Sequence, residues 1–163
     1  RRAPFRAPHH SASMEGLVGG GRPMLPGEAS LAHGGVLFLD EASEFRPSIL
    51  QALREPIETK RVLISRAGGR GWFPSNFQLL LAGNSCPCGN LGRDEEACLC
   101  SRREVQLYWR RLGGPLMDRV DIRVRTTPPA TNELLYGSRV TSAELASQVV
   151  AAREIQRDDY RFA

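Results

Sequence analysis

An apolar run at residues 35–39 that stops at two adjacent carboxylates, Asp40 and Glu41, constrains the fold of this chain more than any other feature. A short apolar run after glycines is typical of a buried parallel strand, and ligands of open α/β sheets bind where such strands end. Two neighbouring acids there are costly to desolvate without a cation or a proton. The pattern therefore predicts Mg²⁺ held through Asp40 and a water activated by Glu41. The alternative is a buried strand followed by a helix N-terminus that the carboxylates stabilise.

The strand and its carboxylates resemble a Walker B element, which normally acts together with a phosphate-binding loop of the form Gly-x-x-x-x-Gly-Lys-Ser/Thr. The sequence contains no such loop. Its single lysine, Lys60, has no glycine loop before it and no hydroxyl residue after it, and the glycines at 19–21 lead into Pro23 instead of a helix. The chain also starts within a motif and ends within a helical pattern, so we expect it to be a piece of a larger protein.

The composition predicts an ordinary globular domain, with 41% hydrophobic and 25% charged residues. The net charge of +4 comes from basic residues spread along the chain. This charge is compatible with a polyanionic partner, and equally with a general bias of arginine over lysine. No apolar run approaches the roughly 18 residues of a membrane span, and no signal-peptide pattern opens the chain. We therefore expect a cytoplasmic protein without a membrane segment.

A helix and a second buried strand are expected to continue the α/β pattern. The helix spans about 43–55, with Pro47 in its first turn and Pro56 at its end. The second apolar run, at 77–83, ends at Asn84, and two buried strands that end in polar residues belong side by side in a parallel sheet. Asn84 would then orient a water that attacks a terminal phosphate.

Between this helix and the second strand, residues 61–74 predict a β-hairpin. Strands at 61–66 and 72–73 flank a glycine-rich tip. Arg66 and Arg70 lie near the tip, where they either face nucleic acid or belong to an ordinary surface turn. The residues alone leave both interpretations open.

Four cysteines form two Cys-x-Cys pairs, Cys86 with Cys88 and Cys98 with Cys100. In a reducing compartment such pairing favours a metal over disulfides, and four thiolates suit tetrahedral Zn²⁺. The Cys-x-Cys spacing is rarer than the Cys-x-x-Cys knuckle. The alternative is therefore four free or partly oxidised thiols in a loop.

Two capped helices are expected after the cysteines. Ser101 and Glu104 form the capping box of a helix that runs to about Leu112. Beyond a linker at 126–130, Ser142 is expected to cap a second helix, which carries apolar residues on one face.

A third core strand is expected at 120–125, between these helices. Arg119 precedes it at an exposed junction and could reach a phosphate, within the chain or on a neighbouring subunit. The alternative is a surface salt-bridge cluster of Arg119 with Asp118 and Asp121, which would contribute little stability.

Three further segments belong together, namely Arg2–Ser13, Pro26–Glu41 and Gly114–Asp121. In this order they resemble the magnesium-chelatase-like AAA+ ATPases of the ComM/YifB type. The similarity extends over nearly the whole chain and keeps the order of the motifs, so it is more specific than any single motif.

The resemblance implies an α/β fold made of two parts. Residues 1–127 would form a partial AAA+ core of the P-loop type, with parallel strands, an inserted β-hairpin and a cysteine-rich loop, but without the Walker A segment. Residues 128–163 would form a linker and the first helix of the helical lid. The hairpin would correspond to an insertion that such ATPases point toward a central pore.

The resemblance also implies roles for four residues. Asp40 and Glu41 would be the Walker B pair, Asp40 holding Mg²⁺ through ATP and Glu41 acting as a catalytic residue. Asn84 would be the sensor-1 polar residue. Arg119 would be an arginine finger that acts across the interface of a ring-shaped homo-oligomer, expected to be a hexamer.

For function, the resemblance implies a protein that couples ATP hydrolysis to DNA remodelling or branch migration in natural transformation. Three other interpretations stay open: a magnesium chelatase ATPase subunit, a nucleic-acid-binding module without ATPase activity, and an interaction domain stabilised by zinc. Without a Walker A loop, we expect this chain by itself neither to bind ATP tightly nor to hydrolyse it.

Overall fold

The computed structural model describes residues 2–66, 69–93, 96–126 and 140–159. The chain divides into two compact units, residues 1–125 and 126–163. The first unit is an α/β structure with a parallel sheet, a β-hairpin and a cysteine cluster, as predicted. It matches a partial P-loop-type core.

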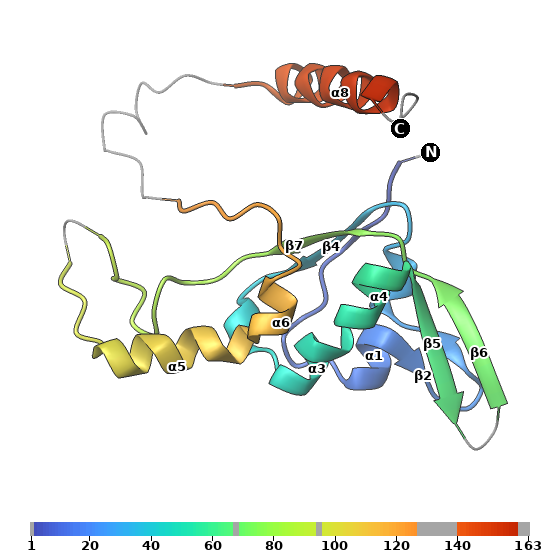
Figure 1. The fold of residues 1–163 in the computed structure, drawn as a ribbon, viewed down its shortest axis with the longest axis horizontal. Helices are drawn as coiled ribbons and strands as arrows, with labels where there is room; N and C mark the ends of the chain where they lie inside the picture. Colours follow the sequence, from blue (N-terminus) through green and yellow to red (C-terminus); the bar gives the residue numbers. More distant parts are fainter. Residues whose placement is uncertain (1, 67–68, 94–95, 127–139, 160–163) are drawn as a thin grey trace. The chain divides into compact units, whose positions relative to one another are not determined.

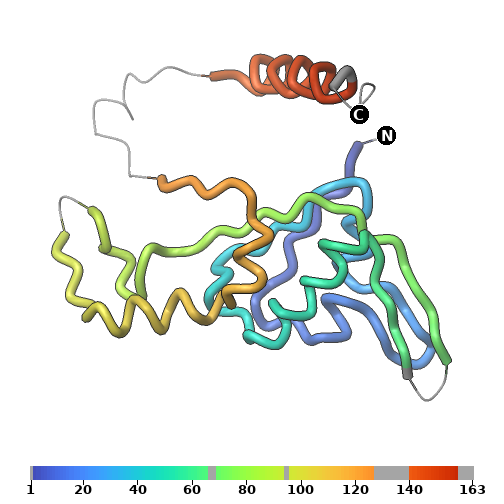
Figure 2. Tube along the Cα trace, viewed as in Figure 1, coloured from blue at the N-terminus to red at the C-terminus, as the bar shows by residue number. Residues whose placement is uncertain are grey.

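Three parallel strands form the sheet of the first unit, in the order β1-β4-β7 (Figures 1 and 2). Val36 begins the central strand, and the two side chains Leu37 and Leu39 are fully buried because helices cover that face. The predicted parallel pairing of the two apolar runs is confirmed. The third strand, β1, is not among the strands that the sequence predicts, and it has only two residues. The bounds of the strands are Phe5–Arg6 for β1, Val36–Leu39 for β4 and Gln78–Leu81 for β7.

A glycine allows β1 to lie beside β4. A Cβ atom at Gly35 would lie 1.9 Å from the carbonyl oxygen of Pro4, which is backbone and cannot rotate away. The amide of Val36 also donates to the Pro4 carbonyl at 2.8 Å. Arg6, the last residue of β1, forms a two-point ion pair with Glu28 at 2.5 and 2.7 Å, which ties the strand to the helix α2 (Glu28–Leu31).

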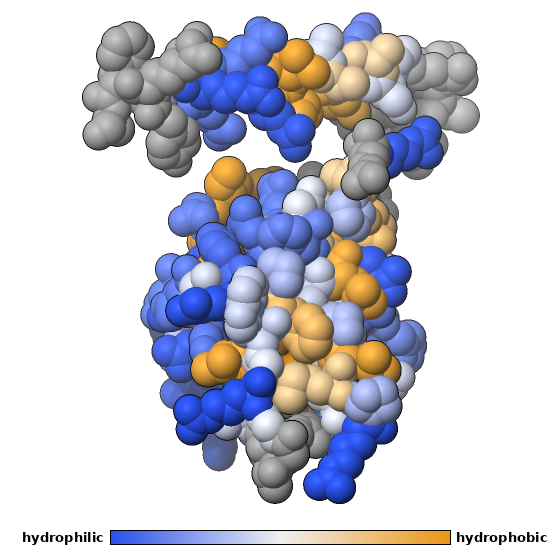
Figure 3. All heavy atoms as spheres, turned by 90° about the vertical axis from the view of Figure 1, so that its right-hand side faces the viewer, coloured by the Kyte–Doolittle hydropathy of each residue, from blue (hydrophilic) through white to orange (hydrophobic). Residues whose placement is uncertain are grey.

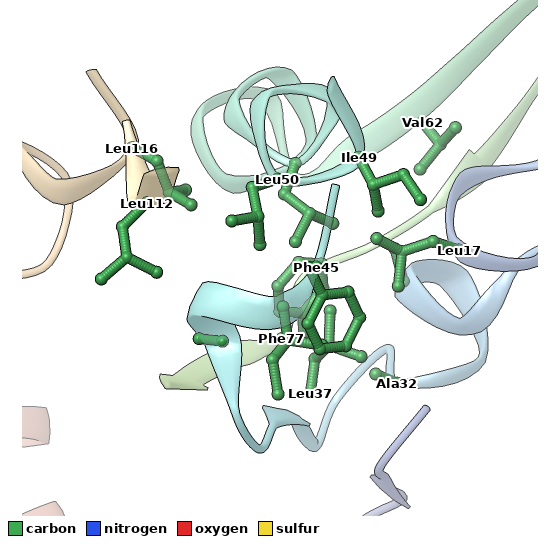
Figure 4. Packing of buried hydrophobic residues seen from close by; sticks show 14 of the residues in the cluster. Leu17, Ala32, Leu37, Phe45, Ile49, Leu50, Val62, Phe77, Leu112 and Leu116 are labelled. Atoms are coloured by element: carbon green, nitrogen blue, oxygen red, sulfur yellow. The ribbon is translucent and has the colours of Figure 1, made fainter. Parts of the chain in front are cut away.

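Four short helices pack with the sheet around one hydrophobic core (Figure 4). Burying a leucine or phenylalanine side chain stabilises the fold by about 1.5–3 kcal/mol, so the core is the main source of stability. The helices are α1 (Met14–Val18), α2 (Glu28–Leu31), α3 (Pro47–Ala52) and α4 (Arg54–Thr59). The core includes Leu17, Leu37, Phe45, Ile49, Leu50, Val62, Leu112 and Leu116.

The prediction of a single helix at 43–55 is wrong at both its start and its end. A short 3₁₀ turn, η1 (Ala42–Glu44), precedes α3, and the helical path continues as α4 beyond Pro56. Pro47 does occupy the first turn of α3. Pro56 lacks the amide that would donate to the carbonyl four residues earlier, so it separates α3 from α4. It is tolerated in the first turn of α4, where amides have no partner within the helix.

The predicted hairpin is confirmed, and it is longer than expected. Its second strand begins at Gly69 rather than Trp72. Val62 and Ile64 point into the core, whereas Leu63 and its cross-strand partner Trp72 are exposed. The hairpin consists of β5 (Arg61–Arg66) and β6 (Gly69–Pro74), and a smaller antiparallel ribbon consists of β2 (Gly19–Gly20) and β3 (Leu25–Pro26).

The helix predicted after the cysteines is confirmed as α5 (Arg102–Leu112), with Ser101 and Glu104 in a complete capping box. A short helix, α6 (Gly114–Met117), follows Gly113.

The prediction of a third core strand at 120–125 is wrong. This segment has no regular secondary structure, and Ile122 and Val124 are 78% and 79% exposed. Strand backbone needs a neighbour for its amides and carbonyls. In the part of the chain that the structure describes, no strand lies beside the segment to provide one.

The second unit contains α8 (Ser142–Asp159). Its cap is Thr141 rather than Ser142: the Thr141 hydroxyl accepts from the Glu144 amide at 3.2 Å, and Glu144 accepts from the Thr141 amide at 2.7 Å. Apart from Thr126, the linker expected at 126–130 lies outside the described residues. The domain boundary after residue 127 stays a prediction. Among the helices that the structure describes, none is both long and apolar enough to cross a membrane.

Candidate functional site

Asp40 and Glu41 lie at the carboxyl end of β4, where the sequence places them. The neighbouring strand continues the pairing past its own end: the amide of Ala82 donates to the Leu39 carbonyl at 3.0 Å, and the amide of Ala42 donates to the Ala82 carbonyl at 2.8 Å. These two bonds fix the backbone on both sides of the carboxylates. The pair is therefore presented at the sheet edge on a rigid support.

The two carboxylates differ in their local structure. Asp40 accepts a hydrogen bond from the Glu41 amide at 2.9 Å through Oδ1. Glu41 has φ 47° and ψ 48°, the left-handed conformation that residues with a Cβ atom rarely adopt. Its side chain is 63% exposed. The Glu41 carboxylate is therefore accessible to solvent.

His10 contacts the Glu41 carboxylate, a partner that the sequence did not reveal. Its Nδ1 atom lies 3.3 Å from Glu41 Oε2. The imidazole also meets the ring of Phe45 edge-on, with centroids 6.4 Å apart, and it stacks near His9 at 4.0 Å. No sequence pattern reveals this contact, because it depends on the parallel pairing of β1 with β4, which brings the residues after the two strands to one edge of the sheet.

Asn84 follows β7 at the same end of the sheet. It lines a cavity of about 260 Å³ against α5. The structure therefore brings the backbone of Asn84 to the sheet edge that carries the two acids. The other residues of the cavity are Glu44, Pro87, Glu104, Leu107, Tyr108 and Arg111.

Arg119 lies just after α6 and pairs with α4. Its Nε donates to Glu58 Oε1 at 2.5 Å, and its guanidinium also donates to the Pro115 carbonyl. The partner of Arg119 is therefore Glu58, not the Asp118 and Asp121 cluster that the sequence suggested as an alternative. Arg119 is held within its own unit in this structure.

The four cysteines converge at one point. Their Sγ atoms all lie within 4.8 Å of one another, with Cys86 3.3 Å from Cys88 and both of these 3.7 Å from Cys98. The Leu91 amide donates to Cys86 Sγ at 3.3 Å. Cys86 is buried, whereas Cys88 is exposed. This arrangement could bind a metal ion.

The thiols also differ in acidity. Burial opposes ionisation of Cys86, but hydrogen bonds from Cys88, the Leu91 amide and Cys98 outweigh burial and lower its pKa to about 6. For Cys100, a bond from the Cys88 amide favours the thiolate. The thiol of Cys88, burial and the Cys86 charge act in the opposite direction and raise the pKa of Cys100 to about 12. The cluster can thus carry negative charge near neutral pH.

The outer face of the hairpin is the third candidate region. Arg70 is exposed and lies opposite Ser65 on β5. The Cα pairing places Leu63 opposite Trp72 beside it, and both of these side chains are more than half exposed. Figure 3, which views the hairpin side, shows hydrophobic side chains interspersed with hydrophilic ones. Arg66 ends β5, and its side chain lies outside the described part of the structure.

Comparison with known proteins agrees with this arrangement. A family profile described as magnesium chelatase, subunit ChlI, matches residues 1–134. The competence protein ComM of Haemophilus influenzae is 44% identical over 160 residues, which cover 97% of this chain and 31% of ComM. The uncharacterized protein YifB of Escherichia coli is 42% identical over 158 residues, 96% of this chain and 31% of YifB.

An uncharacterized protein of Mycobacterium tuberculosis is 41% identical over 161 residues, 98% of this chain and 32% of the relative. The chain therefore spans about a third of the length of the curated relatives it matches. Both the profile and the relatives cover the strands, the carboxylate pair and the cysteine cluster. The chain belongs to the magnesium chelatase family, as a magnesium-chelatase-like protein of the ComM and YifB type.

Proposed function

We propose that this chain supplies the Walker B half of an ATPase site in a ring-forming protein that uses ATP hydrolysis to remodel DNA. The observation that carries the proposal is the pair Asp40 and Glu41, held at the carboxyl end of a buried parallel strand in a protein of the magnesium chelatase family. A cytoplasmic location fits this role.

The residues at the sheet edge fit Mg²⁺ and ATP in their chemistry. Mg²⁺ prefers oxygen ligands and keeps several waters, so one carboxylate such as Asp40 suffices from the protein side. The Asp40 carboxylate uses Oδ1 for a backbone bond, and its second oxygen remains for a cation. Bound ATP with Mg²⁺ would supply the terminal phosphate that is attacked. Glu41, whose side chain is accessible and whose backbone is left-handed, would take the proton of the attacking water.

Asn84 and Arg119 have supporting roles in this proposal. Asn84, which follows β7 at the same end of the sheet, would orient the water by a hydrogen bond. Arg119 would leave Glu58 and stabilise charge on the phosphate of a neighbouring subunit in the ring, for which we propose a hexamer. Glu58 would then be the partner of the Arg119 guanidinium in subunits that do not contact a nucleotide.

The hairpin supports DNA as the substrate. An exposed arginine beside an exposed tryptophan can contact a phosphate and stack on a base. The name competence protein, which the Haemophilus relative carries, fits uptake and processing of DNA. A magnesium chelatase subunit is the alternative within the same family. It would hydrolyse ATP without stimulation by DNA.

Turnover of the full-length protein tests the proposal. Glu41→Gln should lower ATP turnover about 100-fold or more while leaving nucleotide binding intact, because only the proton acceptor is removed. Arg70→Ala should weaken DNA binding at all sequences and flatten its salt dependence, whereas Arg102→Ala, an exposed arginine on α5, should not. Wild-type protein that binds DNA but does not hydrolyse ATP would be a nucleic-acid-binding module instead.

The 163-residue chain gives a second test. It lacks a Walker A loop in its sequence, so calorimetry should detect no tight ATP binding. Micromolar binding by this chain alone would contradict the assignment of the missing phosphate loop to another part of the protein.

A structural Zn²⁺ at the cysteine cluster is a second proposal. Four thiolates at about 2.3 Å on a tetrahedron are separated by about 3.8 Å. The distances of 3.3, 3.7 and 3.7 Å among three of the four sulfur atoms are close to this separation. The ion would fasten the loop between β7 and α5.

Metal analysis decides this proposal. The purified protein should contain about one Zn²⁺ per copy at neutral pH, and Cys86→Ser should remove it. His9→Ala removes a possible metal ligand that lies outside the cluster, so it should leave the Zn²⁺ content unchanged. Four thiols that react with a thiol reagent in metal-free, fully folded protein would contradict the site and favour four free cysteines.

A further inference from the structure

We propose that His10 is a positioning residue for Glu41: its Nδ1 atom orients the carboxylate that accepts the proton of the attacking water. This inference rests on the proposed ATPase function and assigns a role to the histidine pair at 9–10. The role follows from register, from the contact itself and from what holds the imidazole in place.

The register of the sheet brings the two residues together. Phe5 lies opposite Val36 and Arg6 opposite Leu37 in the β1 and β4 pairing. His10 and Glu41 are separated by the same number of residues as each of these pairs. The segments after β1 and β4 leave the sheet side by side. His10, four residues after Arg6, therefore meets Glu41, four residues after Leu37.

The imidazole is better fixed than the carboxylate. The His10 side chain is 34% exposed and that of Glu41 is 63% exposed. His10 packs edge-on against Phe45, which is 1% exposed and belongs to the core. His9, on the other side, is itself held by Ser11, whose amide and hydroxyl lie 3.2 and 2.8 Å from His9 Nδ1. A rigid nitrogen therefore meets a solvated, rotatable carboxylate.

Orientation matters because a carboxylate is a good base only when one oxygen faces the water. The contact is made by Oε2, so Oε1 of Glu41 would be the oxygen that accepts the proton of the water. Without the imidazole, the Glu41 side chain would sample several rotamers in solvent. Loss of His10 should therefore reduce the rate of the chemical step and leave nucleotide binding almost unchanged.

Three variants of the full-length protein separate positioning from packing. His10→Phe keeps a ring against Phe45 and removes the nitrogen, and we expect kcat to fall about tenfold or more with KM changed by less than about twofold. His10→Asn places an amide near the position of Nδ1 and should restore most of kcat. His33→Phe makes the same change before β4, at the opposite end of that strand from Glu41, and as the matched control it should behave as wild type.

Two readouts do not depend on turnover. Binding of a fluorescent ATP analogue should be unchanged in His10→Phe. Nitrogen-15 NMR of histidine-labelled protein should show that Glu41→Gln shifts the Nδ1 resonance of His10 but not that of His33, whose Nδ1 accepts from the Asn76 amide at 3.0 Å. If His10→Phe does not fold, the kcat values of His10→Asn and His10→Gln are compared. The Asn variant should be the more active, because only its amide nitrogen lies near the position of Nδ1.

The outcomes are distinguishable from those of the proposed function. Wild-type protein without ATP turnover would overturn both proposals. Wild-type turnover with unchanged kcat in His10→Phe would overturn the role of His10 alone. An increase in kcat would also overturn it, since the histidine would then restrain Glu41 instead of positioning it. An unshifted His10 resonance in Glu41→Gln would show that the contact does not form.

Discussion

Ser43 and Tyr108 are joined by a hydrogen bond of 2.7 Å between their hydroxyl groups, across 65 positions of sequence. Both residues are almost completely buried, at 4% and 7% exposure. Ser43 lies in η1, two residues after Glu41, and Tyr108 lies on α5. This bond therefore couples the segment that follows the carboxylate pair to the helix that follows the cysteine cluster.

Tyr108→Phe should reduce the free energy of unfolding by about 1–2 kcal/mol, because the buried Ser43 hydroxyl loses its partner. Urea denaturation of the 163-residue chain measures this loss. Ser43→Ala combined with Tyr108→Phe should cost less than the sum of the two single changes, since both polar groups are then removed. Additive effects would mean that the two hydroxyls do not interact in solution.

Gly35→Ala should be severely destabilising, by more than about 3 kcal/mol, since its Cβ would lie 1.9 Å from the backbone oxygen of Pro4. Strand β1 would have to leave β4. Thermal denaturation checks this, with Gly114→Ala as the control. No atom lies within 4 Å of a Cβ at Gly114, so that change should be neutral or slightly stabilising. Equal melting temperatures for the two variants would rule out the close approach of β1.

Arg119 and Glu58 give opposite expectations for structure and function. The pair is partly exposed, with side chains 26% and 50% accessible, so Glu58→Ala should change stability by less than about 1 kcal/mol. In the assembled full-length protein, Arg119→Ala should lower ATP turnover by about 1000-fold, as expected for an arginine finger, and Glu58→Ala by far less. Equal losses in the two variants would indicate that Arg119 acts only through its contact with Glu58.

The capping box of α5 predicts a pH dependence. The hydroxyl and the amide of Ser101 lower the pKa of Glu104 in the folded chain. A lowered pKa contributes stability that is present above the unfolded pKa, about 4.3, and is lost as pH falls through the folded value. Ser101→Ala should therefore destabilise the chain more at pH 7 than at pH 3, because the contact of the Ser101 hydroxyl with the ionised Glu104 is lost only where Glu104 is charged. A loss that is independent of pH would contradict the contact with Glu104.

Local patterns predicted much of this fold. The apolar runs that became β4 and β7 could be identified because each is short, continuous and bounded by polar residues or glycine. The capping box of Ser101 and Glu104 depends on residues three apart, so it can be read directly from the sequence. The hairpin followed from β-branched and aromatic residues around glycines.

The failures share a dependence on partners distant in the chain. Residues 120–125 have a strand-like pattern, but a strand forms only when another strand lies beside it. The contact of His10 with Glu41 depends on the register of β1, which has only two residues and no apolar pattern of its own. The choice of Glu58 rather than Asp118 for Arg119 depends on how α4 packs. Such pairings are set by tertiary structure, where a sequence pattern gives no distance.

The left-handed backbone of Glu41 bears on how this position would respond to selection. Glycine would adopt φ 47° without the strain of about 1–2 kcal/mol that a residue with a Cβ atom carries. Variants chosen from a random library for heat resistance alone should therefore accumulate glycine at residue 41. Variants chosen for turnover should keep glutamate. The residue found at position 41 after each selection would therefore distinguish selection for stability from selection for catalysis.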